Sequence, residues 1–207
     1  MSNLKKIEKL FQDSITTKQK CLAQGMEALE EMSNAISRGI QNGGKIMLCG
    51  NGGSAADAQH LAAEMLVRLR PQNNREGIPA IALTQDTSTI TACGNDFGYD
   101  LLFERMVKTL GKENDSLIAI TTSGNSENII LAMRAAKEIG IKVYGFLGSG
   151  GGRAIKLCDD YFLVPDNNTG RIQEAHITAG HALMECIEDN LIETGYITLE
   201  DNFIKDI

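Results

Sequence analysis

The sequence predicts an α/β protein: a three-layer, doubly wound sandwich with a five-stranded parallel sheet and an N-terminal helical extension. Two observations support this fold class. Short apolar runs alternate with helix-like segments from residue 43 onward, and segments rich in glycine and hydroxyl side chains follow the strand-like runs. Near-continuous apolar strands separated by helices are typical of a parallel sheet covered on both faces.

Each expected strand is a short apolar run. The five runs read KIMLC, PAIAL, SLIAIT, KVYGFL and YFLV, and they cover residues 45–49, 79–83, 116–121, 142–147 and 161–164. Helical patterns lie between them at 54–69, 99–110, 126–139 and 152–158, and a last helix is expected over 171–193. There is no repeat and no break in composition, so residues 1–207 are expected to form one domain with its α/β core at 43–195.

Residues 1–42 precede this core and are helix-like. From Leu4 to Gln41 they contain no proline and only two glycines, Gly25 and Gly39, and their apolar side chains recur at helical spacing. One interpretation is two helices that cover a face of the sheet. The other is a helical hairpin that packs against further subunits of an oligomer. The tail after Thr194 is polar, and we expect it to be loosely held.

Charge and composition argue against several function classes. The formal net charge of −7 opposes binding to nucleic acid or anionic lipid, so neither a nucleic-acid nor a membrane partner is expected. The sequence has no apolar stretch near the roughly 20 residues of a membrane span, and its N-terminus lacks an apolar signal region. Of the five cysteines, Cys49, Cys93 and Cys186 sit among apolar or small residues. This predicts buried free thiols in a reducing compartment, the cytoplasm.

Three segments place glycine or hydroxyl residues where an expected strand ends: CGNGGS (49–54), TTSGNS (121–126) and GSGGG (148–152). In the first, Ser54 is expected to cap the following helix in a capping box with Asp57. The second offers more hydroxyls than one cap needs, at a helix start whose dipole favours an anion. The third is expected to be only a turn. Because ligands of open parallel sheets bind beyond the carboxyl ends of strands, the first two loops predict a phosphate site.

Histidines and a carboxylate follow these loops in a pattern that suits proton transfer. His60 and Glu64 are four residues apart and share a helix face. Gln173 and His181 differ by roughly 80° around the last helix and can border one cleft, whereas His176 is expected to point elsewhere. A glutamate and a histidine suit the base and the acid of an aldose–ketose isomerisation. The same residues alternatively suit a divalent metal, zinc above all.

Four motifs, in order along the chain, resemble the sugar isomerase (SIS) family. They are CGNGGSAADAQHLAAEML, ACGNDFG, ITTSGNSEN and RIQEAHITAGH. Within that family they are most similar to the phosphoheptose isomerases, from about Lys45 to the last helix. The resemblance implies the SIS fold and the conversion of sedoheptulose 7-phosphate to D-glycero-D-manno-heptose 7-phosphate through an enediol(ate). That reaction is the first step of bacterial ADP- or GDP-heptose biosynthesis, which supplies the lipopolysaccharide core and other glycans.

The resemblance also implies roles for individual residues. Glu64 matches the family's general base and His181 its general acid. A zinc site, with one ion per subunit, is implied at His60, Glu64, Gln173 and His181. The implied substrate-binding residues are Asn51, Gly52, Gly53, Ser54, Glu64, Arg68, Asn95, Asp96, Thr121, Thr122, Ser123, Ser126 and Gln173. Family members form homotetramers whose N-terminal helices pack together and whose active sites lie at subunit interfaces.

Two alternatives arise within the same family. One is a non-catalytic SIS protein that regulates the replication initiator. In that relative the catalytic glutamate and histidine positions are not kept, whereas Glu64 and His181 are both present here. The other is an isomerase of another phosphosugar. Ala55 and Ala56, where some heptose isomerases carry a histidine and a cysteine, leave the substrate detail open.

Overall fold

Five parallel strands form one sheet, in the order β2-β1-β3-β4-β5, in the computed structural model, which describes residues 1–199. The strands are β1 (Ile46–Gly50), β2 (Ala80–Ala82), β3 (Ser116–Thr121), β4 (Lys142–Gly148) and β5 (Asp160–Val164). All five strands predicted from apolar runs are present, each within one residue of its expected ends. Because β1 pairs with both β2 and β3, the strand order reverses there, and the carboxyl ends of β1 and β3 are neighbours.

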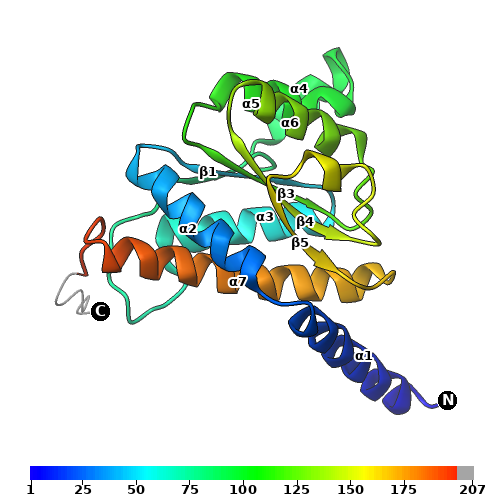
Figure 1. The fold of residues 1–207 in the computed structure, drawn as a ribbon. Coiled ribbons are helices and arrows are strands. Elements are labelled where there is room, and N and C mark those ends of the chain that lie inside the picture. Colours follow the sequence, from blue (N-terminus) through cyan, green and yellow to red (C-terminus); the bar gives the residue numbers. More distant parts are fainter. Residues whose placement is uncertain (200–207) are drawn as a thin grey trace, which may run out of the picture.

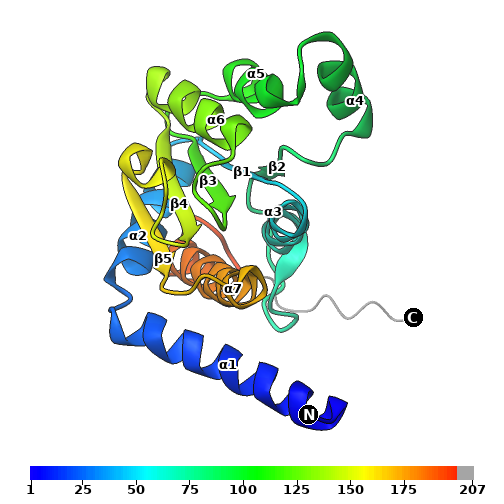
Figure 2. The same cartoon turned by 90° about the vertical axis from the view of Figure 1, so that its right-hand side faces the viewer.

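Helices cover both faces of the sheet, which confirms the three-layer, doubly wound architecture (Figure 1, Figure 2). One face carries α2 (Glu27–Gln41), α3 (Gly53–Ala63) and α7 (Thr169–Glu193), and the other carries α4 (Thr87–Asp96), α5 (Leu102–Leu110) and α6 (Glu127–Glu138). Ile46 and Leu48 join the core on the α7 side, and Met47 and Cys49 join the core on the α6 side. The strands are therefore buried on both faces, as their continuous apolar runs predict.

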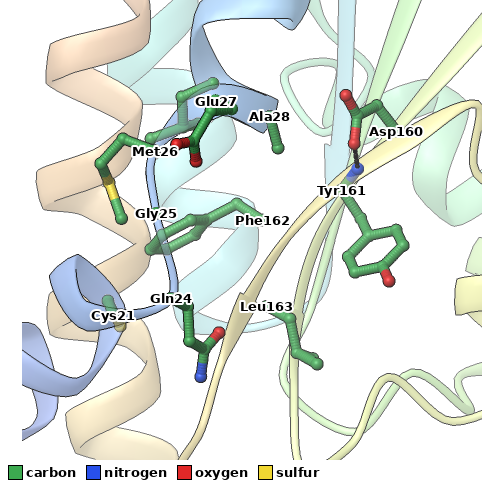
Figure 3. Close-up of a pocket in the computed structure, with 11 residues that line it drawn as sticks. Cys21, Gln24, Gly25, Met26, Glu27, Ala28, Asp160, Tyr161, Phe162 and Leu163 are labelled. Atoms are coloured by element: carbon green, nitrogen blue, oxygen red, sulfur yellow. Dashed lines mark hydrogen bonds between the residues drawn. The ribbon is translucent and has the colours of Figure 1, made fainter.

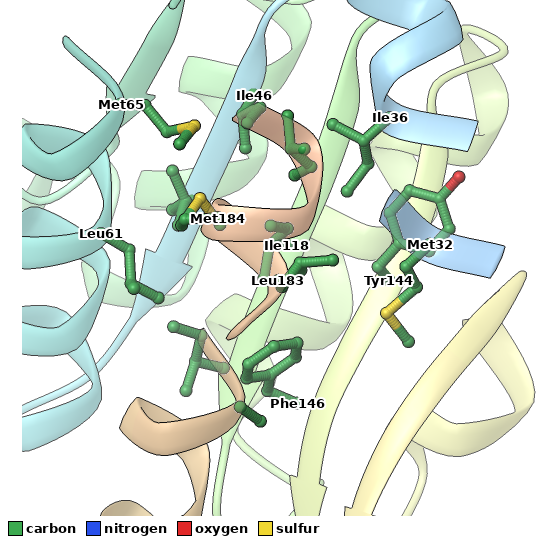
Figure 4. Packing of buried hydrophobic residues seen from close by; sticks show 14 of the residues in the cluster. Met32, Ile36, Ile46, Leu61, Met65, Ile118, Tyr144, Phe146, Leu183 and Met184 are labelled. Carbon is green, nitrogen blue, oxygen red and sulfur yellow. The ribbon is translucent and has the colours of Figure 1, made fainter. Parts of the chain in front are cut away.

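The core on the α7 side joins the elements that carry the candidate site. Figure 4 shows side chains of α3, α7 and the strands packed together, among them Leu61, Met184 and Phe146. At Gly180 an added Cβ would lie 2.6 Å from Cδ1 of Leu61, so α7 approaches α3 closely at this glycine. The spacing between residues of α3 and α7 is therefore set by tight packing.

The N-terminal segment forms two helices, α1 (Asn3–Ala23) and α2, which a turn at Gly25 (φ 92°) separates. α2 packs on the sheet face, whereas α1 extends past the body of the molecule (Figure 1). Several large apolar side chains of α1 are exposed: Leu4, Ile7, Leu10, Phe11, Ile15 and Leu22. The interpretation of residues 1–42 as two helices that cover a face of the sheet therefore holds for α2 but not for α1.

The helices differ most from expectation in four places. α4 was not predicted, because its sequence TSTITACGND has weak apolar periodicity and buries only Cys93. The helix expected over 54–69 is α3 followed by a π-helical turn, η1 (Glu64–Arg68). The helix expected over 99–110 begins as the short η2 (Tyr99–Leu101), and the one expected over 152–158 is only the short η3 (Ala154–Leu157).

The thiols and termini complete the comparison with expectation. Cys49 and Cys93 are buried as predicted, but Cys186 lies on the outer face of α7 and is exposed, so the prediction for Cys186 is wrong. None of the helices formed by residues 1–199 has the length and apolar character of a membrane-crossing segment. Most of the tail expected to be loose, residues 200–207, lies outside the described residues.

Candidate active site

The first glycine-rich loop connects β1 to α3 in a tight turn. Gly52 adopts a left-handed conformation (φ 55°) and is the N-cap of α3, which begins at Gly53. Ser54 is therefore inside the first helical turn, and no side chain caps the helix. The predicted capping box of Ser54 with Asp57 is wrong, because the flexible glycines let the helix begin two residues earlier. The positive end of the α3 dipole faces the space beyond β1 without a competing side-chain cap.

The second loop connects β3 to α6 and uses its hydroxyls in two ways. Thr121 Oγ1 and Ser123 Oγ each accept a hydrogen bond of 3.2 Å from a backbone N–H later in the loop. These two hydroxyls therefore hold the shape of the loop. Ser126 is the N-cap of α6, but its side chain makes no capping hydrogen bond. Its hydroxyl is available to a ligand at the helix start.

The third glycine-rich loop, residues 148–152, supports the second loop from behind. A Cβ at Gly124 would lie 2.0 Å from the carbonyl oxygen of Gly151, so the two backbones are in close contact. Ala154 N donates to the carbonyl of Gly124 at 2.9 Å. This loop is not among the segments that line the pocket described next, which fits the expectation that it is a turn.

The first two loops and the start of α7 line a pocket of about 300 Å³ at the carboxyl ends of β1 and β3. The N-termini of α3, α6 and α7 converge on this pocket, so three helix dipoles favour an anion such as phosphate within it. Ile120 and Thr169 line the pocket although the sequence did not single them out. Eight of the predicted residues also line this pocket: Asn51, Gly52, Gly53, Ser54, Thr121, Thr122, Ser126 and Gln173.

The amide of Asn51 is held in place at this pocket by two side chains. Asn51 and Asn128 exchange two amide hydrogen bonds, each 2.9 Å long, and the hydroxyl of Tyr99 donates to Oδ1 of Asn51 at 2.9 Å. Asn128 is only 2% exposed. Neither Asn128 nor Tyr99 was predicted. Asn128 lies in the ITTSGNSEN motif, yet its contact with Asn51 depends on the pairing of β1 with β3.

Two helix turns beyond the pocket, His60, Glu64 and His181 converge. Nε2 of His60 lies 2.8 Å from Nε2 of His181 and 3.3 Å from Oε1 of Glu64. One ligand atom from each residue lies within 4.8 Å of the others, an arrangement that suits a metal ion. Two imidazoles and one carboxylate are donors that zinc prefers. Gln173, the fourth predicted ligand, lines the pocket two turns earlier on α7.

Both α3 and α7 run from the pocket toward this cluster. Ser54 precedes His60 by six residues, which is roughly 9 Å along a helix axis. Gln173 precedes His181 by eight residues, which is roughly 12 Å. A ligand with its phosphate in the pocket and an extended carbon chain along the two helices therefore reaches the cluster.

Asp57 adds a carboxyl group beside the cluster, on the same face of α3 as His60. Its Oδ2 is buried and has no hydrogen-bond partner among the described residues. Burial raises the pKa of the Asp57 carboxyl, and the charges of His60 and His181 oppose that rise. The sequence-based prediction gave Asp57 only a capping role, because spacing alone does not show which residues become buried together.

His176, the third histidine, is not part of the cluster. It is 1% exposed, and its Nε2 donates to the carbonyl of Leu147 at 3.1 Å. Burial lowers the pKa of His176 to about 4, so the imidazole is a neutral core residue near neutral pH. This confirms the expectation that His176 points away from the site.

Besides Glu64, which lies in the His–Glu cluster, four predicted substrate-binding residues are not among those that line the pocket: Arg68, Ser123, Asn95 and Asp96. All four are exposed. Arg68 ends the π-helical turn that begins at Glu64. Asn95 and Asp96 lie together at the end of α4, where Nδ2 of Asn95 donates to Oδ1 of Asp96 at 2.7 Å.

A second hollow, of about 360 Å³, lies between the α1–α2 turn and the edge strand β5 (Figure 3). It is lined by Cys21, the segment 24–29 and the segment 160–163. The carboxylates of Glu27 and Asp160 line it and disfavour a phosphate. None of the predicted site residues lies there, so the pocket between β1 and β3 is the candidate active site.

The fold, the phosphate pocket and the neighbouring cluster define a SIS domain, and the model of the SIS domain family matches residues 10–148. A phosphoheptose isomerase of Clostridium acetobutylicum is 48% identical over 89% of this chain and 94% of its own length. Another, of Aquifex aeolicus, is 43% identical over 92% of this chain and 98% of its own. The chain belongs to the phosphoheptose isomerase family.

A solved structure of similar fold supports this assignment. The phosphoheptose isomerase of Neisseria gonorrhoeae superposes with a TM-score of 0.85 at 40% identity, covering 91% of this chain and 100% of that one.

Proposed function

We propose that this isomerase converts sedoheptulose 7-phosphate to D-glycero-D-manno-heptose 7-phosphate through an enediol(ate), as the first step of bacterial ADP- or GDP-heptose biosynthesis. One observation carries the proposal: Glu64 and His181 both lie beside His60, two helix turns from a pocket that suits a phosphate. The 7-phosphate would occupy the pocket, and the extended chain would bring C1 and C2 to the cluster. The relatives from Clostridium acetobutylicum and Aquifex aeolicus, which are nearly as long as this chain, are named phosphoheptose isomerases, which supports the proposal.

The reaction moves a carbonyl from C2 to C1 without net gain or loss of atoms. Glu64, as the base, removes a proton from C1 and returns it to C2. His181, as the acid, protonates the carbonyl oxygen at C2, and the hydroxyl proton at C1 is released to the same group. Asn51, Ser54 and Ser126 would hold the phosphate and the sugar hydroxyls in register with these two side chains.

Zinc is the metal that the cluster would hold, one ion per subunit. Two imidazole nitrogens and a carboxylate oxygen within 4.8 Å of one another suit tetrahedral zinc, and Gln173 is the proposed fourth ligand. Bound zinc would polarise the substrate's oxygen atoms. Activity measured before and after chelation, together with the metal content of protein purified without added zinc, tests this part of the proposal.

We further propose a homotetramer in which residues 1–42 pack between subunits and complete the active sites. The exposed apolar side chains of α1 support this, because such a helix is marginal in water without a covering surface. Arg68, Asn95 and Asp96, exposed outside the pocket, would then border the substrate in the assembly. Sedimentation of the full chain would contradict the proposal if it gave a monomer at micromolar concentration. The buried free thiols Cys49 and Cys93 suit the cytoplasm as the compartment.

The activity test uses the purified full chain and sedoheptulose 7-phosphate. Glu64→Gln and His181→Gln should each lower kcat by about 100- to 10,000-fold while the protein stays folded. Glu113→Gln is the matched control, because Glu113 is exposed in the loop before β3, at the opposite end of the sheet. If the wild type forms no heptose phosphate with or without zinc, but turns over another sugar phosphate, the proposed substrate is wrong.

A further inference from the structure

Arg75 and Glu188 form a buried ion pair that lies outside both the pocket and the His–Glu cluster. The side chain of Arg75 is 0% exposed and that of Glu188 is 1% exposed. Nε of Arg75 donates to Oε1 of Glu188. The second oxygen of Glu188 accepts from Arg70 and, at 2.9 Å, from Asn73. Burial opposes ionisation of Glu188, but the hydrogen bonds from Arg75, Asn73 and Arg70 hold its pKa below the ordinary value.

The remaining N–H groups of Arg75 reach the backbone of the turn that carries Glu64. Nη2 donates to the carbonyl of Glu64 at 3.0 Å, and Nη1 donates to the carbonyl of Met65 at 3.0 Å. Nη1 also donates to the carbonyl of Glu76 at 2.9 Å. The carbonyl of Met65 also accepts from the backbone N–H of Ile78 at 2.9 Å. A guanidinium in the last turn of the helix is favoured by the helix dipole. Arg75 therefore caps η1, the π-helical turn that begins with Glu64.

Glu188 connects the same arginine to the helix that carries His181. The two residues are seven positions apart on α7, which is two turns, so they share one face of the helix. A short chain of contacts thus runs from the backbone of Glu64 through Arg75 and Glu188 to α7. These contacts reach α7 at Glu188, which follows His181 in the helix. Before His181, at Gly180, α7 is already in close contact with Leu61 of α3.

We propose that the Arg75–Glu188 pair is a positioning clamp: it fixes the turn that bears Glu64 relative to His181, and so sets the distance between base and acid. The catalytic part of this inference rests on the proposed function. The same distance also sets how closely the metal ligands converge, which does not depend on catalysis. Neither residue touches the substrate in this proposal. Displacement of a reacting group by about 1 Å can lower a rate by 100-fold.

Arg75→Lys tests the clamp while keeping the charge. Lysine can pair with Glu188, but its single ammonium cannot also donate to the carbonyls of Glu64 and Met65 in the same planar geometry. We expect kcat to fall by about 10- to 100-fold with KM within about 2-fold. We also expect zinc affinity to fall by about 10-fold and the absorption of the cobalt-substituted protein to change, since the ligands spread apart.

The matched control is Asp115→Asn at the opposite end of the sheet. Asp115 is 2% exposed and accepts from Lys45 and from the backbone of Lys112, so it is, like Glu188, a buried carboxylate held by an ion pair. This control should lower the melting temperature but leave kcat, zinc affinity and the cobalt spectrum unchanged. If Arg75→Lys does not fold, the double variant Arg75→Met with Glu188→Met removes both charges together and avoids an unpaired buried ion. It should fold and show the same kinetic and metal-binding losses.

The outcomes separate the clamp from the proposed function. If the folded variants keep wild-type kcat and zinc affinity, the pair is only structural and the clamp is overturned. If the wild type is inactive on sedoheptulose 7-phosphate while the variants lose zinc affinity and change the cobalt spectrum, the clamp stands and the proposed function fails. Lower kcat and weaker zinc binding in the variants, with an unaffected Asp115→Asn protein, support both.

Discussion

The phosphate pocket and the His–Glu cluster lie two helix turns apart but are built in different ways. The pocket is made of loop backbone, hydroxyls and helix starts, and the pairing of β1 with β3 places its two loops side by side. The cluster is made of side chains, and His60 and His181 meet across 121 positions of sequence. Anion binding should therefore tolerate the loss of one side chain, whereas the cluster should not. Variants that affect one region and spare the other test this contrast.

The largest effect is expected when the cluster alone is damaged. His60→Ala removes a proposed zinc ligand whose imidazole lies beside both Glu64 and His181, so zinc affinity should fall by at least about 100-fold. The affinity for inorganic phosphate should stay within about 2-fold, because the pocket does not contain His60. Titration calorimetry with zinc and with phosphate measures both. Gln59→Ala, one position earlier on α3, is the control. A parallel loss of phosphate affinity would show that the two regions are not separable.

A smaller effect is expected when the pH is lowered. It concerns both regions, because it acts on the stability of the whole fold. His176 stays neutral in the folded protein down to a pKa of about 4, whereas in the unfolded chain it titrates near its ordinary value of 6.5. The unfolded state thus binds an extra proton between these values, and the free energy of unfolding should fall by about 3 kcal/mol as pH drops from 6.5 to 4. Urea denaturation at several pH values measures this. His176→Met should flatten the dependence, and an unchanged slope would contradict the assignment.

The smallest of these effects is expected when the pocket is altered at Gly53. A Cβ at Gly53 would lie 2.5 Å from Nε2 of Gln173, so Gly53→Ala displaces that amide from the pocket. Phosphate affinity should fall by about 10-fold, since backbone groups still supply most of the anion site. Zinc affinity should fall less than in His60→Ala, because His60, Glu64 and His181 keep their positions. An unchanged zinc affinity would show that Gln173 is not a ligand. Gly94→Ala, with open space around its added Cβ, is the control.

Most of the fold could be predicted from the sequence because each strand can be recognised from its own residues. Each is a run of apolar residues buried on both sides, and the apolar run of β3 matches its strand to the residue. The missed helix α4 shows the limit of this approach. It lies at the edge of the fold and buries a single side chain, Cys93, so it lacks the apolar stripe on which helix prediction depends.

The site was predictable where one segment supplies both the residue and its setting. The spacing of His60 and Glu64 places them on one helix face, and Nε2 of His60 lies 3.3 Å from Oε1 of Glu64. Contacts between distant segments were not predictable. Asn128 and Arg75 are ordinary polar residues in the sequence, and their importance arises from partners that only the folded chain brings near them.

The π-helical turn η1 has a consequence for how the chain tolerates deletion. A π turn is equivalent to one extra residue within an α-helix. A chain that lacked one residue between Glu64 and Arg68 would form a regular helix there, with better backbone hydrogen bonding. Because the wide turn already accommodates that extra residue, the residues after the deletion would keep roughly their direction around the helix axis relative to His60. The turn is therefore the part of this helix in which the loss of one residue between Glu64 and Arg68 should disturb the rest of the chain least.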